Sequence, residues 1–159
     1  MKRWFSIAAA VLVLIGAPIA KAQEKIDIPS RTPGTLSEYA HGQGAAVTVV
    51  GYLYLPGGIK GPLPAVILKH GSGGLSGPQG ENIRKWARSL NDWGIAAFVV
   101  DSFGPRGLEG TGADQSKLRS LADLADAFAA LKVLGADARI DRGRIGIMGW
   151  SRGGGDRSS

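Results

Sequence analysis

The chain has 159 residues, of which 44% are hydrophobic and 25 are glycine, so its length and composition predict one globular domain with many tight turns. It contains no cysteine, which excludes a disulfide framework, a thiol nucleophile and a cysteine-ligated zinc site. The formal charge is +6, but no basic run is interleaved with aromatic residues, and we therefore expect no nucleic-acid partner.

The first 22 residues have the order of a bacterial signal peptide. A basic start at Lys2-Arg3 precedes an apolar stretch from Trp4 to Ile15, and the small-x-small triplet Ala20-Lys21-Ala22 follows. The alternative is a membrane anchor, but the apolar run is shorter than the ~20 residues that a bilayer requires. We therefore expect cleavage after Ala22, export to the periplasm or the medium, and no stable membrane anchor.

The next part of the chain predicts two strands. Residues 23–44 are polar and broken by prolines and glycines, which indicates an irregular lead-in. Ala45 to Leu55 is rich in β-branched and aromatic residues and ends at Pro56, so it predicts a strand in an antiparallel pair near a sheet edge. Leu63 to Lys69 is a short apolar run, which is typical of a strand buried on both faces of a parallel sheet.

Helical and strand patterns then alternate. Apolar residues recur at helical spacing from Ile83 to Trp93, and Gly94 follows at the position of a helix C-cap. Ile95 to Val100 predicts a second buried strand, and Arg144 to Met148 predicts a third.

Between these strands, a second amphipathic helix is indicated by Leu118, Leu121, Ala122, Ala125, Phe128 and Ala129. Asp114 or Ser116 is available as its N-cap. Strands that alternate with helices predict an α/β fold, with a mostly parallel sheet and flanking helices.

The chemistry of such a sheet gathers beyond the carboxyl ends of its strands, and three loops leave such ends, at residues 70–74, 101–107 and 149–153. The third loop contains Gly149-x-Ser151-x-Gly153, directly after a predicted buried strand. That context predicts a nucleophile elbow, in which the serine occupies the apex of a sharp turn and the glycines leave room for it. Two alternatives are a plain turn that uses Ser151 as a helix cap, and a phosphate-binding loop. The latter needs G-x-G-x-x-G, and Ser151 stands where its second glycine belongs.

The first loop, His70-Gly71-Ser72-Gly73-Gly74, complements the elbow. Attack on an ester carbonyl creates an oxyanion that backbone N–H groups stabilise. One donor is expected from Arg152, which follows the nucleophile, and the other from Ser72, because Gly71 and Gly73 let the backbone come close. We interpret His70 as a support of the loop through hydrogen bonds, and we assign no role to His41. Asp101, at the start of the middle loop, is interpreted as a turn cap.

Three motifs together resemble the dienelactone hydrolase family of the α/β-hydrolase fold. They are HGSGG at 70–74, VDSFGPRG at 100–107 and RIGIMGWSRGG at 144–154, and the resemblance covers residues 45–154. It implies a secreted serine hydrolase that cleaves ester or lactone bonds of small molecules, with Ser151 as nucleophile and an oxyanion hole from Ser72 and Arg152. No cofactor and no metal is expected.

The sequence departs from this family after the serine. The family has the order Ser…Asp/Glu…His, but no histidine follows Ser151, and the only later acid is Asp156. We therefore expect residues 23–159 to be the N-terminal part of the hydrolase domain, lacking the triad acid, the triad histidine and the C-terminal strands and helices. Such a truncated or frameshifted product would be inactive. The alternative function is a non-catalytic exported fragment that binds a small carbonyl compound or a partner chain.

Overall fold

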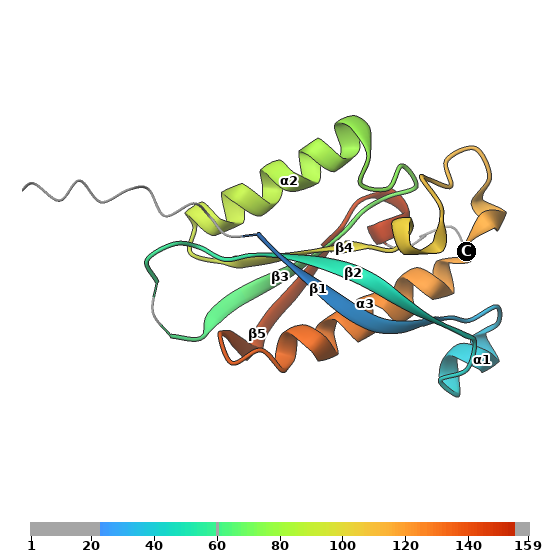
Figure 1. The fold of residues 1–159 in the computed structure, drawn as a ribbon, viewed down its shortest axis with the longest axis horizontal. Coiled ribbons are helices and arrows are strands. Elements are labelled where there is room, and N and C mark those ends of the chain that lie inside the picture. The colour runs from blue at the N-terminus through green and yellow to red at the C-terminus, as the bar shows by residue number, and fades with distance from the viewer. Residues whose placement is uncertain (1–22, 60, 155–159) are drawn as a thin grey trace, which may run out of the picture.

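The computed structural model describes residues 23–59 and 61–154 (Figure 1). The predicted signal segment, its cleavage site after Ala22 and Asp156 lie outside these residues. The main elements are β1 (Gln23–Thr32), α1 (Leu36–Ala40), β2 (Ala45–Tyr54), β3 (Leu63–Lys69), α2 (Gly77–Asp92), β4 (Ala96–Asp101), α3 (Ser120–Gly135) and β5 (Ile140–Gly149). Three short 3₁₀ turns accompany them, η1 (Gly104–Arg106), η2 (Gln115–Lys117) and η3 (Ser151–Gly154).

The described strands form one mixed sheet in the order β1-β2-β4-β3-β5. β2 pairs antiparallel with both β1 and β4, whereas β3 pairs parallel with β4 and with β5. The predicted α/β fold is confirmed, and its parallel part is the trio β4-β3-β5. Because β3 is parallel to both of its neighbours, the carboxyl ends of these three strands lie side by side.

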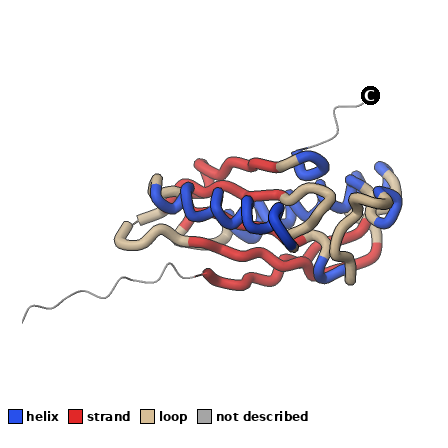
Figure 2. Tube along the Cα trace, turned by 90° about the horizontal axis from the view of Figure 1, so that it is seen from above, coloured by secondary structure: helices blue, strands red, loops and turns tan. Residues whose placement is uncertain are grey.

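The sheet is the middle of three layers, with α2 on one face and α3 on the other (Figures 1 and 2). The strand β4 shows why the two apolar runs at β3 and β4 were predicted correctly as buried strands. Phe98 and Val100 pack in the core cluster under α3, while Ala97 and Val99 pack in the cluster under α2, and all four are at most 2% exposed. A strand covered on both faces is apolar at every position. The third run, Arg144 to Met148, is part of a strand, but none of its residues is buried, because β5 lies at the edge of the described sheet.

The predicted irregular lead-in is wrong, because residues 23–32 form the edge strand β1, and α1 follows it. All ten residues of β1 pair with β2, with Ile28 opposite Val49. Ile26 and Ile28 alternate with polar residues and face the core beneath α3. Pro29 is tolerated because an edge strand has one side free of ladder hydrogen bonds.

Helix α2 ends as the sequence predicts, with Gly94 at φ +76 after the C-cap Trp93. The predicted cap of α3 is wrong. Asp114 accepts a hydrogen bond from the N–H of Ser116 (2.9 Å), which caps the short turn η2, and α3 begins only at Ser120. Asp114 and Ser116 stay in the loop before α3, because Thr111 and Gln115 bind this loop to Ser72 in the loop after β3.

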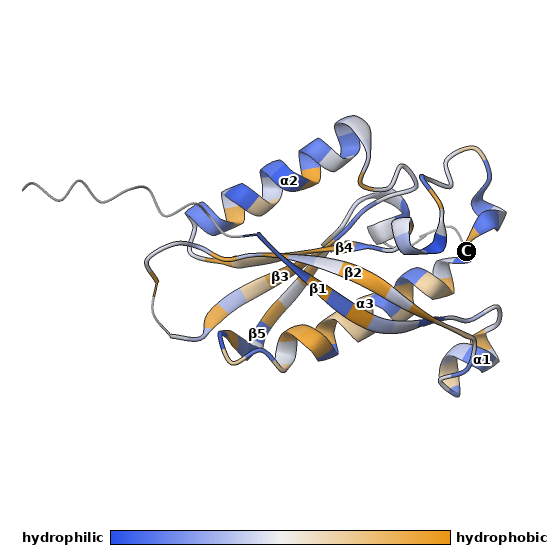
Figure 3. Cartoon of the chain, viewed as in Figure 1, coloured by the Kyte–Doolittle hydropathy of each residue, from blue (hydrophilic) through white to orange (hydrophobic). Residues whose placement is uncertain are grey.

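Apolar side chains also reach the surface beside β5. The outer face of α2 is largely hydrophilic in Figure 3, whereas α3 carries apolar residues over much of its visible surface. Leu124, Phe128 and Leu131 of α3 are at least 40% exposed, and Ile147 of β5 is 59% exposed. Together they line an apolar groove of about 230 Å³. No helix among the described residues is long and apolar enough to cross a bilayer.

Candidate active site

The backbone bends sharply at Ser151, directly after β5. Ser151 has φ 51, and it is the only residue other than glycine with a positive φ in the described part of the chain. Residues other than glycine rarely adopt a positive φ, which costs of order 1–3 kcal/mol. The surrounding structure must therefore impose this backbone conformation on Ser151. The turn η3 begins at this residue, and the strand-to-turn apex is the geometry that a nucleophile elbow requires.

Glycines make this bend possible. A Cβ at position 149 would overlap the carbonyl oxygen of Gly153, and a Cβ at position 153 would lie 2.5 Å from the carbonyl oxygen of His70. A Cβ at position 71 would lie 2.9 Å from the carbonyl oxygen of Trp150, so the loop after β3 approaches the elbow closely. At position 73 the obstacle is the flexible side chain of Gln79, which makes the need for Gly73 weaker.

The elbow opens into a polar cavity. Ser151 is exposed and lines a cavity of about 830 Å³, together with Ser72, Gln115, Ser116, Arg119, Ser120, Leu121 and Arg152. A second cavity of about 260 Å³ lies beside it and shares Ser72 and Ser151 with the first. The structure therefore brings Ser72, Ser151 and Arg152, predicted from two loops, to one cavity.

The backbone donors expected from the sequence are unoccupied. Among the described residues, neither the N–H of Ser72 nor the N–H of Arg152 donates a hydrogen bond. The carbonyl oxygen of Ser72, by contrast, accepts from the N–H of Thr111 (2.7 Å). A backbone N–H without a partner, in a residue that lines a cavity, can donate to an anionic oxygen of a ligand.

Solved structures share this architecture. A dienelactone hydrolase from Anabaena variabilis matches with a TM-score of 0.54 and 20% identity, over 84% of this chain and 54% of that one. The same fold occurs in a dienelactone hydrolase-like promiscuous phosphotriesterase from metagenomic libraries, with a TM-score of 0.54 and 20% identity, over 81% and 49% of the chains.

This chain has the dienelactone hydrolase fold.

The esterase Est22 also matches, with a TM-score of 0.56 and 24% identity, over 86% of this chain and 37% of the esterase. The chain thus spans about half the length, or less, of the hydrolases that it matches. No protein-family model and no curated protein matches the sequence.

Neither histidine forms a hydrogen bond with the Ser151 hydroxyl, which makes no hydrogen bond within the described residues. His70 is 1% exposed, and its Nε2 accepts from the N–H of Ser102 (3.1 Å). Nδ1 must therefore carry the ring proton, which it donates to the carbonyl oxygen of Gly71 (2.8 Å). Burial lowers the pKa of His70, so the ring stays neutral. His41 lies at the end of α1, with Nδ1 2.8 Å from the carbonyl oxygen of Ser37.

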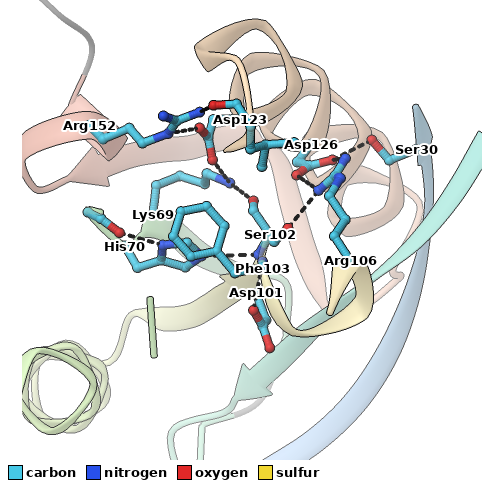
Figure 4. Close-up of polar contacts among 12 residues, drawn as sticks. Ser30, Lys69, His70, Asp101, Ser102, Phe103, Arg106, Asp123, Asp126 and Arg152 are labelled. Atoms are coloured by element: carbon cyan, nitrogen blue, oxygen red, sulfur yellow. Dashed lines mark hydrogen bonds and ion pairs between the residues drawn. The ribbon is translucent and has the colours of Figure 1, made fainter. Parts of the chain in front are cut away.

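A buried ionic cluster underlies the elbow, and sequence reasoning missed it (Figure 4). Asp123 of α3 accepts from Nε of Arg152 (2.6 Å) and lies 3.8 Å from Nζ of Lys69. Nζ of Lys69 also donates to the hydroxyl of Ser102. Burial lowers the pKa of Lys69, and the neighbouring carboxylates Asp126 and Asp123 oppose that effect. Two features of the sequence could have indicated this cluster. Lys69 ends an apolar strand, and Asp123 lies on the buried face of α3.

A second ion pair fixes the middle loop to α3 and to β1. Arg106 binds Asp126 in a fork, with nitrogen–oxygen distances of 2.7 and 3.0 Å, and the hydroxyl of Ser30 donates to the same carboxylate (2.6 Å). Asp101 accepts from the N–H groups of Phe103 (3.0 Å) and Gly104, which confirms its interpretation as a turn cap. The described residues contain no group of three or more acidic or histidine side chains that could hold a metal ion.

Proposed function

We propose that this chain carries the nucleophile and the oxyanion hole of a serine hydrolase that cleaves ester or lactone bonds of small molecules. The observation that carries the proposal is the conformation of Ser151, at φ 51 on a cavity that Ser72 and Arg152 also line. Among the described residues, the N–H groups of Ser72 and Arg152 donate no hydrogen bond. A plain turn does not require a strained serine. The esterases and dienelactone hydrolases among the structural neighbours support the same class of reaction.

In the proposed reaction, Oγ of Ser151 attacks the carbonyl carbon of the substrate. The carbonyl oxygen becomes an anion and accepts hydrogen bonds from the N–H groups of Ser72 and Arg152, a contribution worth roughly 10²–10³ in rate for each donor. The C–O bond to the alcohol then breaks, the alcohol oxygen takes a proton, and water hydrolyses the acyl-serine. In a lactone the alcohol stays attached to the acyl group. The cavity volume of about 830 Å³ suits a small substrate.

The proton of the Ser151 hydroxyl needs an acceptor, and the described residues offer none. Both nitrogens of His70 are engaged, and His41 is the C-cap of α1, where its Nδ1 contacts Ser37. An unactivated serine is a weak nucleophile. We therefore expect slow hydrolysis by the chain on its own, and a faster reaction when a base is supplied in solution.

The test is hydrolysis of p-nitrophenyl acetate by the purified chain at increasing imidazole concentration, because imidazole can replace the missing base. The excess rate is the hydrolysis rate with protein minus the rate with imidazole alone. It should rise with imidazole concentration for the wild-type chain and for Ser37→Ala, a serine control on α1. It should vanish for Ser151→Ala. Equal excess rates for the wild-type chain and Ser151→Ala would overturn the proposal.

The second candidate function is binding of a small carbonyl compound without turnover, and the missing proton acceptor favours it. It predicts no Ser151-dependent rate at any imidazole concentration, but saturable binding of a small trifluoromethyl ketone that Ser151→Ala weakens. The imidazole experiment therefore separates the two functions.

We also propose that the protein is exported to the periplasm or the medium, with cleavage between Ala22 and Gln23. The support is the basic, apolar and small-residue order of residues 1–22. N-terminal sequencing of the exported protein should give Gln23 as the first residue. A mature protein that still begins at Met1 would contradict export by cleavage.

A further inference from the structure

The side chain of Gln115 joins the two residues whose N–H groups form the proposed oxyanion hole. Its Nε2 donates to Oγ of Ser72 (2.8 Å), and its Oε1 accepts from Nη1 of Arg152 (2.9 Å). Ser72 follows β3 and Arg152 follows β5. Within the described residues, no backbone hydrogen bond joins Ser72 directly to Arg152. Gln115 belongs to η2 and lines the same cavity as both of them.

The orientation of the Gln115 amide follows from its partners. The guanidinium of Arg152 can only donate, so the amide oxygen must face it, and the amide nitrogen is left for the hydroxyl of Ser72. The hydroxyl of Thr111, a residue with no exposed surface, also donates to the amide oxygen (3.3 Å). The bridge therefore has one defined arrangement, which other residues of the loop hold in place.

The side chain of Arg152 is mostly committed to partners within the protein. Besides Gln115, it binds Asp123 through Nε (2.6 Å) and the carbonyl oxygen of Leu118 through Nη2, and only 6% of the side chain is exposed. Its charge is paired with Asp123. The contacts of this side chain therefore fix the position of its own backbone, including the free N–H.

We propose that Gln115 is a positioning residue, which sets the spacing between the N–H groups of Ser72 and Arg152 in the oxyanion hole. The inference rests on the proposed function. Gln115 acts through the two residues that it joins, because small displacements of a preorganised donor weaken its interaction with the oxyanion. Loss of the bridge should slow the chemical step and leave substrate binding almost unchanged.

The test is the kinetics of Ser151 modification by a fluorophosphonate in the presence of imidazole. In this reaction the Oγ–P bond forms, the P–F bond breaks, fluoride leaves and imidazole takes the hydroxyl proton, while the P=O oxygen occupies the oxyanion hole. The concentration dependence gives the maximal rate and the half-saturating concentration separately. Gln115→Met has nearly the same shape without the hydrogen bonds, and Gln43→Met is the matched control near α1.

We expect Gln115→Met to lower the maximal rate about tenfold, less than the ~10²–10³ for loss of a whole donor, at an unchanged half-saturating concentration. Ser72→Ala removes one contact of the bridge and keeps the backbone N–H. The double variant Gln115→Met/Ser72→Ala should then react at the rate of Gln115→Met, because both changes break the same bridge.

Three results would overturn the inference. Gln115→Met could have the same maximal rate as Gln43→Met, or it could change only the half-saturating concentration. In the third, the rate losses of Gln115→Met and Ser72→Ala multiply in the double variant. If the far-ultraviolet circular dichroism spectrum shows that Gln115→Met has an altered fold, Gln115→Leu is measured in its place. If wild-type Ser151 is not modified at all, the proposed function fails and this inference falls with it. Modification of Ser151 that ignores Gln115 refutes the positioning role alone.

Discussion

Asp123 and Arg152 form a buried ion pair, with 2.6 Å between Oδ2 and Nε and side chains that are 8% and 6% exposed. The pair connects the first turn of α3 to the residue that follows Ser151. The other carboxylate oxygen of Asp123 makes no hydrogen bond and faces Nζ of Lys69 at 3.8 Å. Asp123 therefore faces two basic side chains beneath the elbow, and Asp126 is the other carboxylate close enough to act on Lys69 (Figure 4).

Asp123→Ala should destabilise the fold by about 3–5 kcal/mol, because it leaves Arg152 buried without its counter-charge and removes one of the two carboxylates that act on Lys69. Urea unfolding, followed by circular dichroism, measures the free energy. Asp141→Ala is the matched control, since its ion pair with Arg144 lies on the surface and should contribute little that can be measured. Equal midpoints for the two variants would show that the buried pair does not support the fold.

Gly153→Ala should also be destabilising, by roughly 1–3 kcal/mol, as for other overpacked sites. Its Cβ would meet the backbone oxygens of His70 and Lys69 at 2.5 and 2.7 Å, and neither carbonyl group can move without disturbing β3. Gly57→Ala is the control, because a Cβ there meets nothing within 4 Å. Thermal unfolding of both variants tests this, and a Gly153→Ala protein as stable as Gly57→Ala would contradict the described elbow.

Stability should fall as the pH is lowered through the ordinary pKa of histidine, 6.5. Burial is the main cause that lowers the pKa of His70, so between its folded pKa and 6.5 the unfolded chain binds a proton that the folded chain does not. Protonation therefore favours unfolding in this window, and the stabilisation is regained as the pH rises.

The measurement is the urea concentration at the midpoint of unfolding, for the wild-type chain, His70→Gln and His41→Gln. It is made at several pH values between about 5.5 and 7.5, above the range where carboxylates titrate. His70→Gln should be less stable at pH 7.5 and should lose the steeper part of the pH dependence. His41→Gln should keep it. If His41→Gln, rather than His70→Gln, removes the dependence, the buried histidine is not its source.

The apolar surface beside β5 should promote self-association. Ile147 is 59% exposed on a strand whose outer edge is unpaired within the described sheet, next to the exposed Phe128 of α3. Exposed strand edges with apolar side chains pair readily with other chains, and a lysine on the edge opposes this. Ile147→Lys should shift the purified chain toward monomer in size-exclusion chromatography. Leu36→Lys, an exposed leucine on α1, should not.

The sequence predicted those elements whose local pattern already reflects their surroundings. β3 has the predicted bounds, and β4 is offset by one residue, because strands covered on both faces are apolar throughout and are bounded by turn residues. The elbow was predictable because its backbone shape depends on glycines at fixed offsets from Ser151. β1 was missed because Pro29 and its polar neighbours outweighed the alternation of Ile26 and Ile28.

The ionic cluster could not be predicted from local patterns. Lys69 lies next to Asp123 only because β3 and α3 pack together, 54 residues apart in the chain. The same holds for the Gln115 bridge, whose two partners lie 43 and 37 residues away. Hydrophobic periodicity places residues on a face, but it contains no information about which polar groups meet across layers.

The most direct test of the account is the location of a covalent adduct. The purified chain is incubated with a fluorophosphonate and imidazole, digested, and mapped by tandem mass spectrometry. The account predicts one adduct, on Ser151, with none on Ser120 or Ser116, which line the same cavity. A chain unfolded in urea should show no such selectivity. An adduct on another cavity serine, or equal modification of folded and unfolded chains, would contradict the assignment of Ser151 as the nucleophile.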